Sequence, residues 1–451
     1  MPIDIPGVYV EEISNFPPSV AQVETAIPAF IGFTEKSKDG QGKSLKNKPQ
    51  RITNILEYEL YFGGAFAQTY TITVIENNGS KNITYTPKSA KNYFFYDALR
   101  LYFENGGGPC YIISIGNYTS SVNLNSFSNA LNTIDTCDES TIIVFPEAVN
   151  LTMSNYGILI QSALTKCAKW ESKFLLTDVL SKNSVDGFRQ SIGVENLKYG
   201  AAYLPGLNTN YKGKVNTAKS LVLHYDQNQN KLQYHNKLLN DPSIPPAFLN
   251  EILNAIKINN LPASSAIAGV ICEMDRNRGF WKAPANVCLN GIKNLTENIT
   301  VQEQENLNVD PAQGKSINAI RFFTGDGNMV WGARTLAGND NEWRYIPVRR
   351  SFQLIEKSIE KGIEFFVFEP NDANTWARIK AMIENYLTSL WRQGALQGAK
   401  PEHAFFVAIG LSITMTSLDI LEGKLNVVVG LALVRPAEFI ILKIQHKMQD
   451  A

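Results

Sequence analysis

The first part of the chain alternates between short apolar runs and longer stretches in which apolar residues recur at helical spacing. The runs of strand length are residues 26–34, 110–115, 141–145 and 173–177. The helical stretches are residues 57–62, which end at Gly63, and residues 93–104 and 156–170. Strands that alternate with helices are typical of a parallel sheet covered by helices. We therefore predict that residues 23–340 form a central α/β domain.

Two polar segments interrupt this pattern. Residues 69–75 and 82–86 alternate between apolar and polar positions around Asn77-Asn78-Gly79-Ser80, which predicts a β-hairpin. Residues 208–260 are rich in Asn, Lys and Gln and carry three prolines. We interpret both segments, near 69–86 and 208–260, as insertions on the surface of the central domain.

The C-terminal part of the chain predicts a smaller α+β domain over residues 341–434. A helix is expected at 350–361, and strands are expected at 363–368, 404–414 and 425–434. The clearest helix in the sequence is 373–393, which Gly394 can end. Its apolar stripe consists of Trp376, Ile379, Ile383, Leu387 and Leu390.

Both ends of the chain have the pattern of isolated strands, which we define as arms at residues 1–22 and 435–451. Residues 6–13 alternate in polarity and are followed by a diproline, so this strand has no nearby partner. Residues 438–448 alternate in the same way, which specifies one buried face. The backbone groups must be paired within the same subunit or by another chain. The candidate pairing residues are Val8, Tyr9, Val10, Phe439, Ile440, Ile441, Leu442 and Ile444.

Composition and charge exclude several classes of function. The 451 residues carry 42 Lys and Arg against 42 Asp and Glu, so no net positive field attracts nucleic acid or anionic lipid. The N-terminal residues do not resemble a secretory signal, and no apolar run approaches the roughly 20 residues that cross a bilayer. We therefore expect a soluble protein made in the cytoplasm, without nucleic-acid or membrane partners.

Motifs for catalysis or cofactor binding are missing. Gly42-Lys43-Ser44 and Gly314-Lys315-Ser316 resemble the end of a phosphate-binding loop, but the glycine needed five residues earlier is Ser37 or Val309. The five cysteines show no CxxC spacing, and neither GxSxG nor HExxH occurs. The four histidines do not identify a general base. We predict no catalytic, cofactor-binding or metal-binding residues, no cofactor and no enzymatic activity.

Four groups of segments carry a family resemblance. They are PGVYVEE at 6–12 with TAIPAFIG at 25–32, FENGG at 103–107 with CYII at 110–113, AIAGV at 266–270 with RGFWKAPAN at 278–286, and VWGARTL at 330–336 with several segments that follow it as far as PAEF at 436–439. The segments that follow include Val348-Arg349-Arg350 and FEPN at 368–371, and Asp275-Arg276 belongs to the third group. Together they resemble the tail-sheath family of contractile phages, R-type bacteriocins and extracellular injection systems.

The resemblance implies an architecture and a function. The central domain would be related to the subtilisin fold without its catalytic residues, and residues 341–434 would be the core sheath domain. Each subunit would lend its two arms to neighbours in a sheet that links hexameric rings stacked helically around an inner tube. Contraction would use energy stored in the extended lattice and drive the tube through a target envelope. Baseplate and terminal cap proteins would be further partners, within a virion or a released phage tail-like particle assembled in the bacterial cytoplasm.

The clearest helix also offers a surface for the tube. Arg378, Asn385 and Arg392 recur every seven residues opposite the apolar stripe, so we predict that they face the inner tube. An ordinary solvated helix face would produce the same pattern. The alternative function is a hydrolase-like domain without an active site that serves as a binding module or a trimeric spike.

Overall fold

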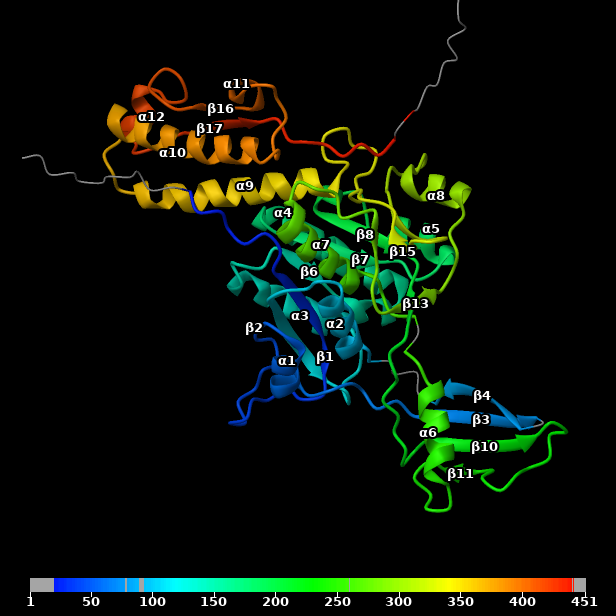
Figure 1. The fold of residues 1–451 in the computed structure, drawn as a ribbon. Helices are drawn as coiled ribbons and strands as arrows, with labels where there is room; N and C mark the ends of the chain where they lie inside the picture. The colour runs from blue at the N-terminus through cyan, green and yellow to red at the C-terminus, as the bar shows by residue number, and fades with distance from the viewer. Residues whose placement is uncertain (1–19, 78, 89–92, 259, 440, 442–451) are drawn as a thin grey trace, which may run out of the picture. The chain divides into compact units, whose positions relative to one another are not determined.

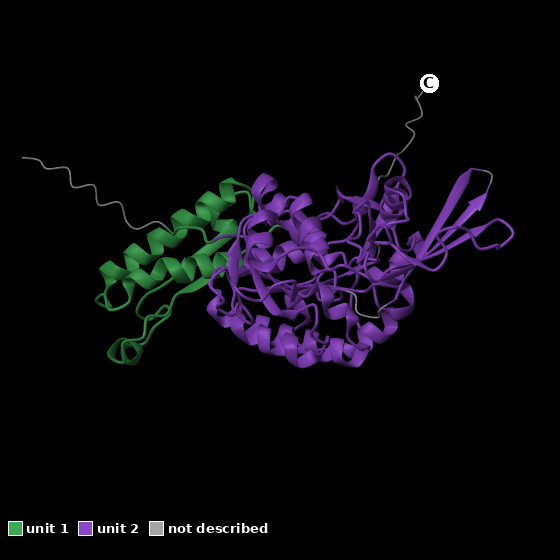
Figure 2. Ribbon diagram, turned by 90° about the horizontal axis from the view of Figure 1, so that it is seen from below, with its two compact units in different colours: residues 1–23, 354–434 green, residues 24–353, 435–451 purple. Residues whose placement is uncertain are grey.

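The computed structural model (Figure 1) describes residues 20–77, 79–88, 93–258, 260–439 and 441. The described chain divides into two compact units (Figure 2). Unit 1 contains residues 20–23 and 354–434, and unit 2 contains residues 24–353 and the described part of 435–451. The arm residues Val8, Tyr9, Val10, Ile440, Leu442 and Ile444 lie outside the described residues. The scheme of two arms and two domains therefore stays a prediction.

A nine-stranded sheet forms the centre of unit 2, in the order β12-β15-β14-β8-β7-β6-β1-β5-β2. The strands from β14 to β5 in this order pair in parallel, which confirms the predicted parallel α/β arrangement. Antiparallel partners extend the sheet at both edges. The bounds are β1 Pro28–Thr34, β2 Gln50–Ile52, β5 Cys110–Asn117, β6 Ile142–Val144, β7 Phe174–Asp178, β8 Gly200–Leu204, β12 Val287–Cys288, β14 Asn318–Phe323 and β15 Gly327–Val330. A separate pair consists of β9 Leu207–Thr209 and β13 Ile292–Leu295.

Helices cover both faces of this sheet. Side chains of β1 alternate between two hydrophobic clusters, so that Phe30 packs with residues of α2 and α7 while Ile31 packs with residues of α3 and α4. Gly269 lets α7 approach α2, because a Cβ atom there would lie 2.4 Å from the main-chain oxygen of Tyr102. The bounds are α1 Ile55–Phe62, α2 Phe95–Glu104, α3 Leu124–Thr133, α4 Met153–Trp170, α5 Val185–Ser191, α7 Ser264–Arg278 and α8 Val301–Asn308. Short 3-10 helices lie at Ile134–Thr136, Pro146–Asn150, Lys182–Ser184 and Leu197–Tyr199.

The two segments predicted as separate insertions fold together. A four-stranded sheet has the order β11-β10-β3-β4, and β3 pairs in parallel with β10, which lies far away in the sequence. One helix, α6, packs against this sheet over a hydrophobic cluster of its own that includes Ile72, Val222 and Phe248. The bounds are β3 Tyr70–Asn77, β4 Ser80–Pro87, β10 Leu221–Asp226, β11 Lys237–Leu238 and α6 Pro246–Ala255. We call this group of elements the insertion module (Figure 1).

The insertion module should tolerate removal only as a whole. Deleting the β3–β4 hairpin alone would expose the edge of β10 and strip Ile72 and Val74 from the shared cluster, so we expect aggregation. Deleting both segments removes the whole cluster. The two segments join the rest of unit 2 at neighbouring points, since the Gln68 amide donates to the Lys214 carbonyl oxygen over 2.9 Å. Soluble yield and thermal unfolding measure the difference. Equal solubility of the single and the joint deletion would contradict the co-folding of the two segments.

Unit 1 combines two long helices with a short antiparallel pair of strands. The predicted apolar stripe of α10 is confirmed, since Ile379, Ile383, Leu387 and Leu390 are buried and Trp376 is half-buried. Asp372 caps this helix by accepting a hydrogen bond from the Thr375 amide. The bounds are α9 Ile346–Ile363, which spans the boundary between the units, α10 Ala373–Arg392, α11 Pro401–Ala404, β16 Phe405–Ala408, α12 Ser417–Leu421 and β17 Val428–Leu431.

Several predicted strands of this region differ from the structure. The strand at 363–368 is wrong, because α9 continues to Ile363 and a 3-10 helix follows at Glu364–Phe366. The strand at 404–414 is limited to β16, since Gly410 and Ser412 have φ angles of 148° and 60° that turn the chain. The strand at 425–434 is limited to β17 and an isolated bridge at Leu433. Of the strand at 438–448, residues 438, 439 and 441 are described, and they are not in a strand.

Candidate assembly surface

The β16–β17 pair presents open strand edges. Phe405 pairs with Leu431 and Ala408 pairs with Val428, and in the described chain no third strand joins this sheet. The Phe406 ring lies over Gly430, where a Cβ atom would be 2.1 Å from the ring, and the Phe406 side chain remains 58% exposed. An open edge supplies unpaired N–H and C=O groups to an added strand. This sheet is therefore suited to binding an extended segment of another chain.

Large apolar side chains are exposed throughout unit 1. Isolated exposed apolar residues are ordinary on a protein surface, but a concentration of them marks an interaction site. In unit 1 the exposed ones are Phe365, Val367, Phe368, Phe406, Leu411, Ile413, Leu418, Leu421 and Val428. Burying them requires a partner, which makes unit 1 the best candidate for an assembly surface.

The turn between α9 and α10 adds backbone strain to this exposure. Phe368 has a φ angle of 72°, a left-handed conformation that is costly for an aromatic residue, and its side chain is fully exposed. The guanidinium group of Arg378 lies 3.6 Å from the Glu369 carboxylate and 5.2 Å from the centre of the Phe366 ring. Arg378 therefore braces this turn from within unit 1.

The predicted tube-facing residues share one helix but differ in environment. Arg378, Asn385 and Arg392 all lie on α10. Arg378 is half-buried by the contacts just described, whereas Asn385 and Arg392 are exposed. The structure contains no tube, so their role stays a prediction.

Inside unit 2, three of the segments that carry the family resemblance meet at one buried ion pair. Arg350 donates to both carboxylate oxygens of Asp275, over 3.0 Å and 2.6 Å, and to the main-chain oxygen of Thr25 over 2.9 Å. The side chains of Arg350 and Asp275 are only 6% and 2% exposed. This geometry fixes α7 and the segment before β1 to the start of α9.

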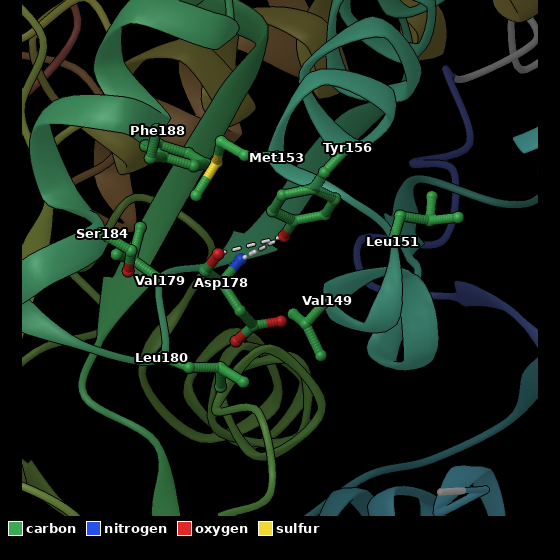
Figure 3. A pocket seen from close by; sticks show the side chains of 9 residues that line it. All are labelled: Val149, Leu151, Met153, Tyr156, Asp178, Val179, Leu180, Ser184 and Phe188. Atoms are coloured by element: carbon green, nitrogen blue, oxygen red, sulfur yellow. Dashed lines mark hydrogen bonds between the residues drawn. The ribbon is translucent and has the colours of Figure 1, made fainter. Parts of the chain in front are cut away.

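A pocket of about 210 Å³ lies beside the carboxyl end of β7 (Figure 3). The hydroxyl group of Tyr156 donates to the main-chain oxygen of Asp178, and the Asp178 carboxylate accepts a hydrogen bond from the Ser264 amide over 2.8 Å. Burial raises the pKa of Asp178 to about 6. The lining residues are Val149, Leu151, Met153, Tyr156, Asp178, Val179, Leu180, Ser184 and Phe188.

This pocket lacks the parts of a hydrolytic site. None of the residues that line it is a histidine. Asp178 instead caps the first turn of α7. The described residues also contain no cluster of three or more His, Cys, Asp or Glu side chains that could hold a metal ion.

The structure also bears on the second phosphate-loop-like motif and on membrane spans. Lys315, from the second phosphate-loop-like motif, is 2% exposed, and its ammonium group donates to Gln313 Oε1 over 3.0 Å and to the Arg189 carbonyl oxygen. It is therefore unavailable to a phosphate group. In the part of the chain that the structure describes, none of the helices combines the length and apolar character needed to span a membrane.

The fold and the surface together define an α/β structural subunit. Its unit 1 exposes apolar side chains and open strand edges that are suited to association with other chains. The family model of the phage tail sheath C-terminal domain matches residues 338–447. The contracted helical sheath of the anti-feeding prophage is 32% identical, with a TM-score of 0.68 and coverage of 98% of this chain and 99% of that chain. The sheath of an extracellular contractile injection system, PVC, in the contracted state is 30% identical, with a TM-score of 0.66 and 99% coverage of both chains. The chain belongs to the contractile tail sheath protein family.

Curated relatives match over a shorter region. The tail sheath protein of Vibrio phage KVP40 is 28% identical over 136 residues, which are 30% of this chain and 20% of that protein. The tail sheath protein of Enterobacteria phage T4 is 28% identical over 131 residues, which are 28% of this chain and 19% of that protein. The aligned region thus spans about a fifth of each phage protein's length.

Proposed function

We propose that this chain is the structural subunit of a contractile sheath that polymerises helically around an inner tube and contracts to drive the tube through a target envelope. The observation that carries the proposal is the similarity along 98% of the chain to a helical sheath in the contracted state. The extended lattice would store the energy, and release from the baseplate would trigger the change. No nucleotide is required, which agrees with the burial of Lys315.

The arms link subunits by completing the open sheet of unit 1. The N-terminal arm of one neighbour, through Val8, Tyr9 and Val10, and the C-terminal arm of another extend the β16–β17 pair. Roughly six backbone hydrogen bonds per arm at about 1 kcal/mol each would contribute on the order of 5 kcal/mol per link before ordering costs. Because each subunit takes part in several links, dissociation requires all of them to break. The C-terminal arm residues are Phe439, Ile440, Ile441, Leu442 and Ile444.

The central domain acts as a scaffold related to the subtilisin fold. The parallel sheet, with Asp178 and Ser264 at its carboxyl edge, supports this relation, and the lack of a histidine among the residues that line the pocket there supports a loss of catalysis. In this scheme residues 23–340 form the scaffold, and residues 341–434 form the core sheath domain. The protein has no enzymatic role.

The partners follow from the same assignment. Chains in two baseplate structures of the anti-feeding prophage are similar to this one, at 32% and 29% identity, which supports a contact with baseplate proteins. We further propose hexameric rings, an inner tube protein and a terminal cap protein. The equal numbers of basic and acidic residues argue against nucleic acid and membranes. The assembled sheath would belong to a virion or a released tail-like particle made in the bacterial cytoplasm.

Co-expression with a tube protein and baseplate proteins tests this function. We expect electron micrographs to contain rods in a long, narrow form and in a short, wide form with a protruding tube. Particles of one constant length that lack this chain would contradict the proposal.

The tube-facing assignment predicts a selective defect. Charge reversal at Arg378 and Arg392 to Glu should reduce recovery of the tube protein with the sheath by at least about 10-fold, because charged contacts become repulsive. Self-polymerisation should persist for Arg392→Glu alone, since Arg392 is exposed, whereas Arg378→Glu also places a second carboxylate beside Glu369 in unit 1. Replacing the exposed Lys43 and Lys46 of unit 2 with Glu is the matched control. Equal tube recovery in all three proteins would refute the assignment.

A further inference from the structure

Glu438, near the start of the predicted C-terminal arm, is held by three side chains of unit 2. Arg334 Nε lies 2.9 Å from Glu438 Oε1, and an Arg334 terminal nitrogen lies 2.6 Å from Oε2. Asn308 donates to Oε1 over 2.9 Å, and the Tyr345 hydroxyl donates to Oε2 over 3.0 Å. Although burial opposes ionisation, the hydrogen bonds and charge of Arg334 hold the pKa of Glu438 below its ordinary value. We call these four residues the Glu438 clamp.

The clamp is built on regular elements of the central domain. The Arg334 amide donates to Asn318 Oδ1 over 2.7 Å, and Asn318 Nδ2 donates back to the Arg334 carbonyl oxygen over 2.8 Å. Asn318 begins β14, and Asn308 ends α8. The Arg334 side chain is only 3% exposed. A guanidinium group fixed in this way is pre-organised to bind the carboxylate through two hydrogen bonds in bidentate geometry.

The clamp lies close to the last described residues of the chain. Unit 1 ends at Val434, and Glu438 belongs to unit 2. The Glu438 side chain is 18% exposed, whereas Phe439 is 70% and Ile441 is 81% exposed. Glu438 is thus the last described side chain that packs into unit 2, and it lies within the first residues of the predicted arm, 435–451.

We propose that the Glu438 clamp sets the root, and thereby the register, of the C-terminal arm. This inference rests on the proposed sheath function. A strand that slips by one residue turns its buried face outward, so an arm that pairs with a neighbour needs a fixed starting point. Release of Glu438 would move that starting point back to Arg435, whose guanidinium group donates to the Asn341 carbonyl oxygen over 2.8 Å. Three residues of added tether span about 10 Å when extended, which is enough to permit several registers.

Glu438→Gln tests the clamp in two measurements. In the unpolymerised subunit, hydrogen exchange of the peptide covering 435–441 should accelerate by about 10-fold, because Gln has no negative charge and only one acceptor oxygen for Arg334. In polymerisation, the variant should give short or irregular tubes. Thermal unfolding should also shift down, because the buried Arg334 guanidinium loses its counter-charge, so polymerisation is compared well below the transition temperature. Glu342→Gln, at an exposed glutamate three residues before Tyr345, is the matched control and should behave like the parent protein.

Tyr345→Phe keeps the test decisive if Glu438→Gln fails to fold. It removes one hydrogen bond of the clamp and should accelerate exchange by a few fold. Unchanged exchange in both variants would overturn the clamp itself. Faster exchange with regular, full-length tubes would overturn its role in positioning the arm. If the parent protein never polymerises, the proposed sheath function fails, while the exchange measurement still tests the clamp.

Discussion

Removing residues 439–451 is expected to abolish polymerisation while the subunit stays folded. The described residues of this segment, Phe439 and Ile441, are 70% and 81% exposed, so the deletion removes little buried area from the subunit. In the polymer it removes one linking strand from every subunit. A loss on the order of 5 kcal/mol per link corresponds to an affinity decrease of roughly 1,000- to 10,000-fold. Sedimentation measures the polymer fraction, and circular dichroism with thermal unfolding measures the fold.

A pair of matched variants separates strand pairing from a non-specific loss of the tail. Replacing Ile440, Leu442 and Ile444 with Ser alters one face of the predicted strand and should prevent polymerisation. Replacing Ile441, Lys443 and Gln445 with Ser alters the opposite face and should leave most of the polymer. Polymers of normal yield from the truncated chain, or equal defects in both triple variants, would contradict the arm model.

Asp275→Asn is expected to lower the free energy of unfolding by about 3–5 kcal/mol, because it leaves a buried guanidinium group without its counter-charge. Arg350 is 6% exposed and has Asp275 as its ion-pair partner. Urea unfolding of the non-polymerising truncated chain gives the value without interference from assembly. Asp326→Asn, at an exposed aspartate, should change the free energy by less than about 0.5 kcal/mol.

A double variant tests the physical cause of this loss. Replacing Asp275 with Leu and Arg350 with Met removes both charges from the buried site. Apolar replacement of a whole buried pair costs less than breaking it. The double variant should therefore be more stable than Asp275→Asn. A double variant that is less stable would show that packing around Arg350, rather than charge compensation, dominates.

Local patterns in the sequence predict much of this fold. The strands β1, β5, β6 and β7 are short apolar runs because they are buried on both faces of a parallel sheet. Helix α10 is evident because one of its faces is buried and the other is exposed. The predicted strand at 363–368 is wrong because composition alone does not distinguish a strand from the end of a helix. Its aromatic and β-branched composition favours a strand, but Phe366 is buried between exposed neighbours at the end of a helix.

Long-range pairing is what the sequence does not reveal. Strand β10 pairs with β3 across a large separation, and nothing in either segment specifies the other, so the insertions are not predicted to fold together. The same limit applies to the polar contacts. Arg334, Glu438, Arg350 and Asp275 all lie in segments that carry the family resemblance, but their pairing emerges only in the fold.

In the candidate assembly surface, too, the sequence predicts the local helix pattern but not the contacts between separate segments. Seven-residue spacing correctly places Arg378, Asn385 and Arg392 on one helix. The contact of Arg378 with Glu369 joins helix α10 to the turn before it, and no periodic pattern in the sequence predicts such a contact. The strain at Phe368 and the open edges of the β16–β17 pair likewise depend on backbone geometry. The arms and the tube contact stay predictions from the sequence.

Negative-stain electron microscopy of the purified full-length chain, expressed alone, tests the central claim most directly. The account predicts long hollow tubes of constant diameter, since contacts between identical subunits are sufficient to build the contracted lattice. Uniform small particles, which persist when tube and baseplate proteins are co-expressed, would contradict the assignment of this chain as a self-assembling sheath subunit.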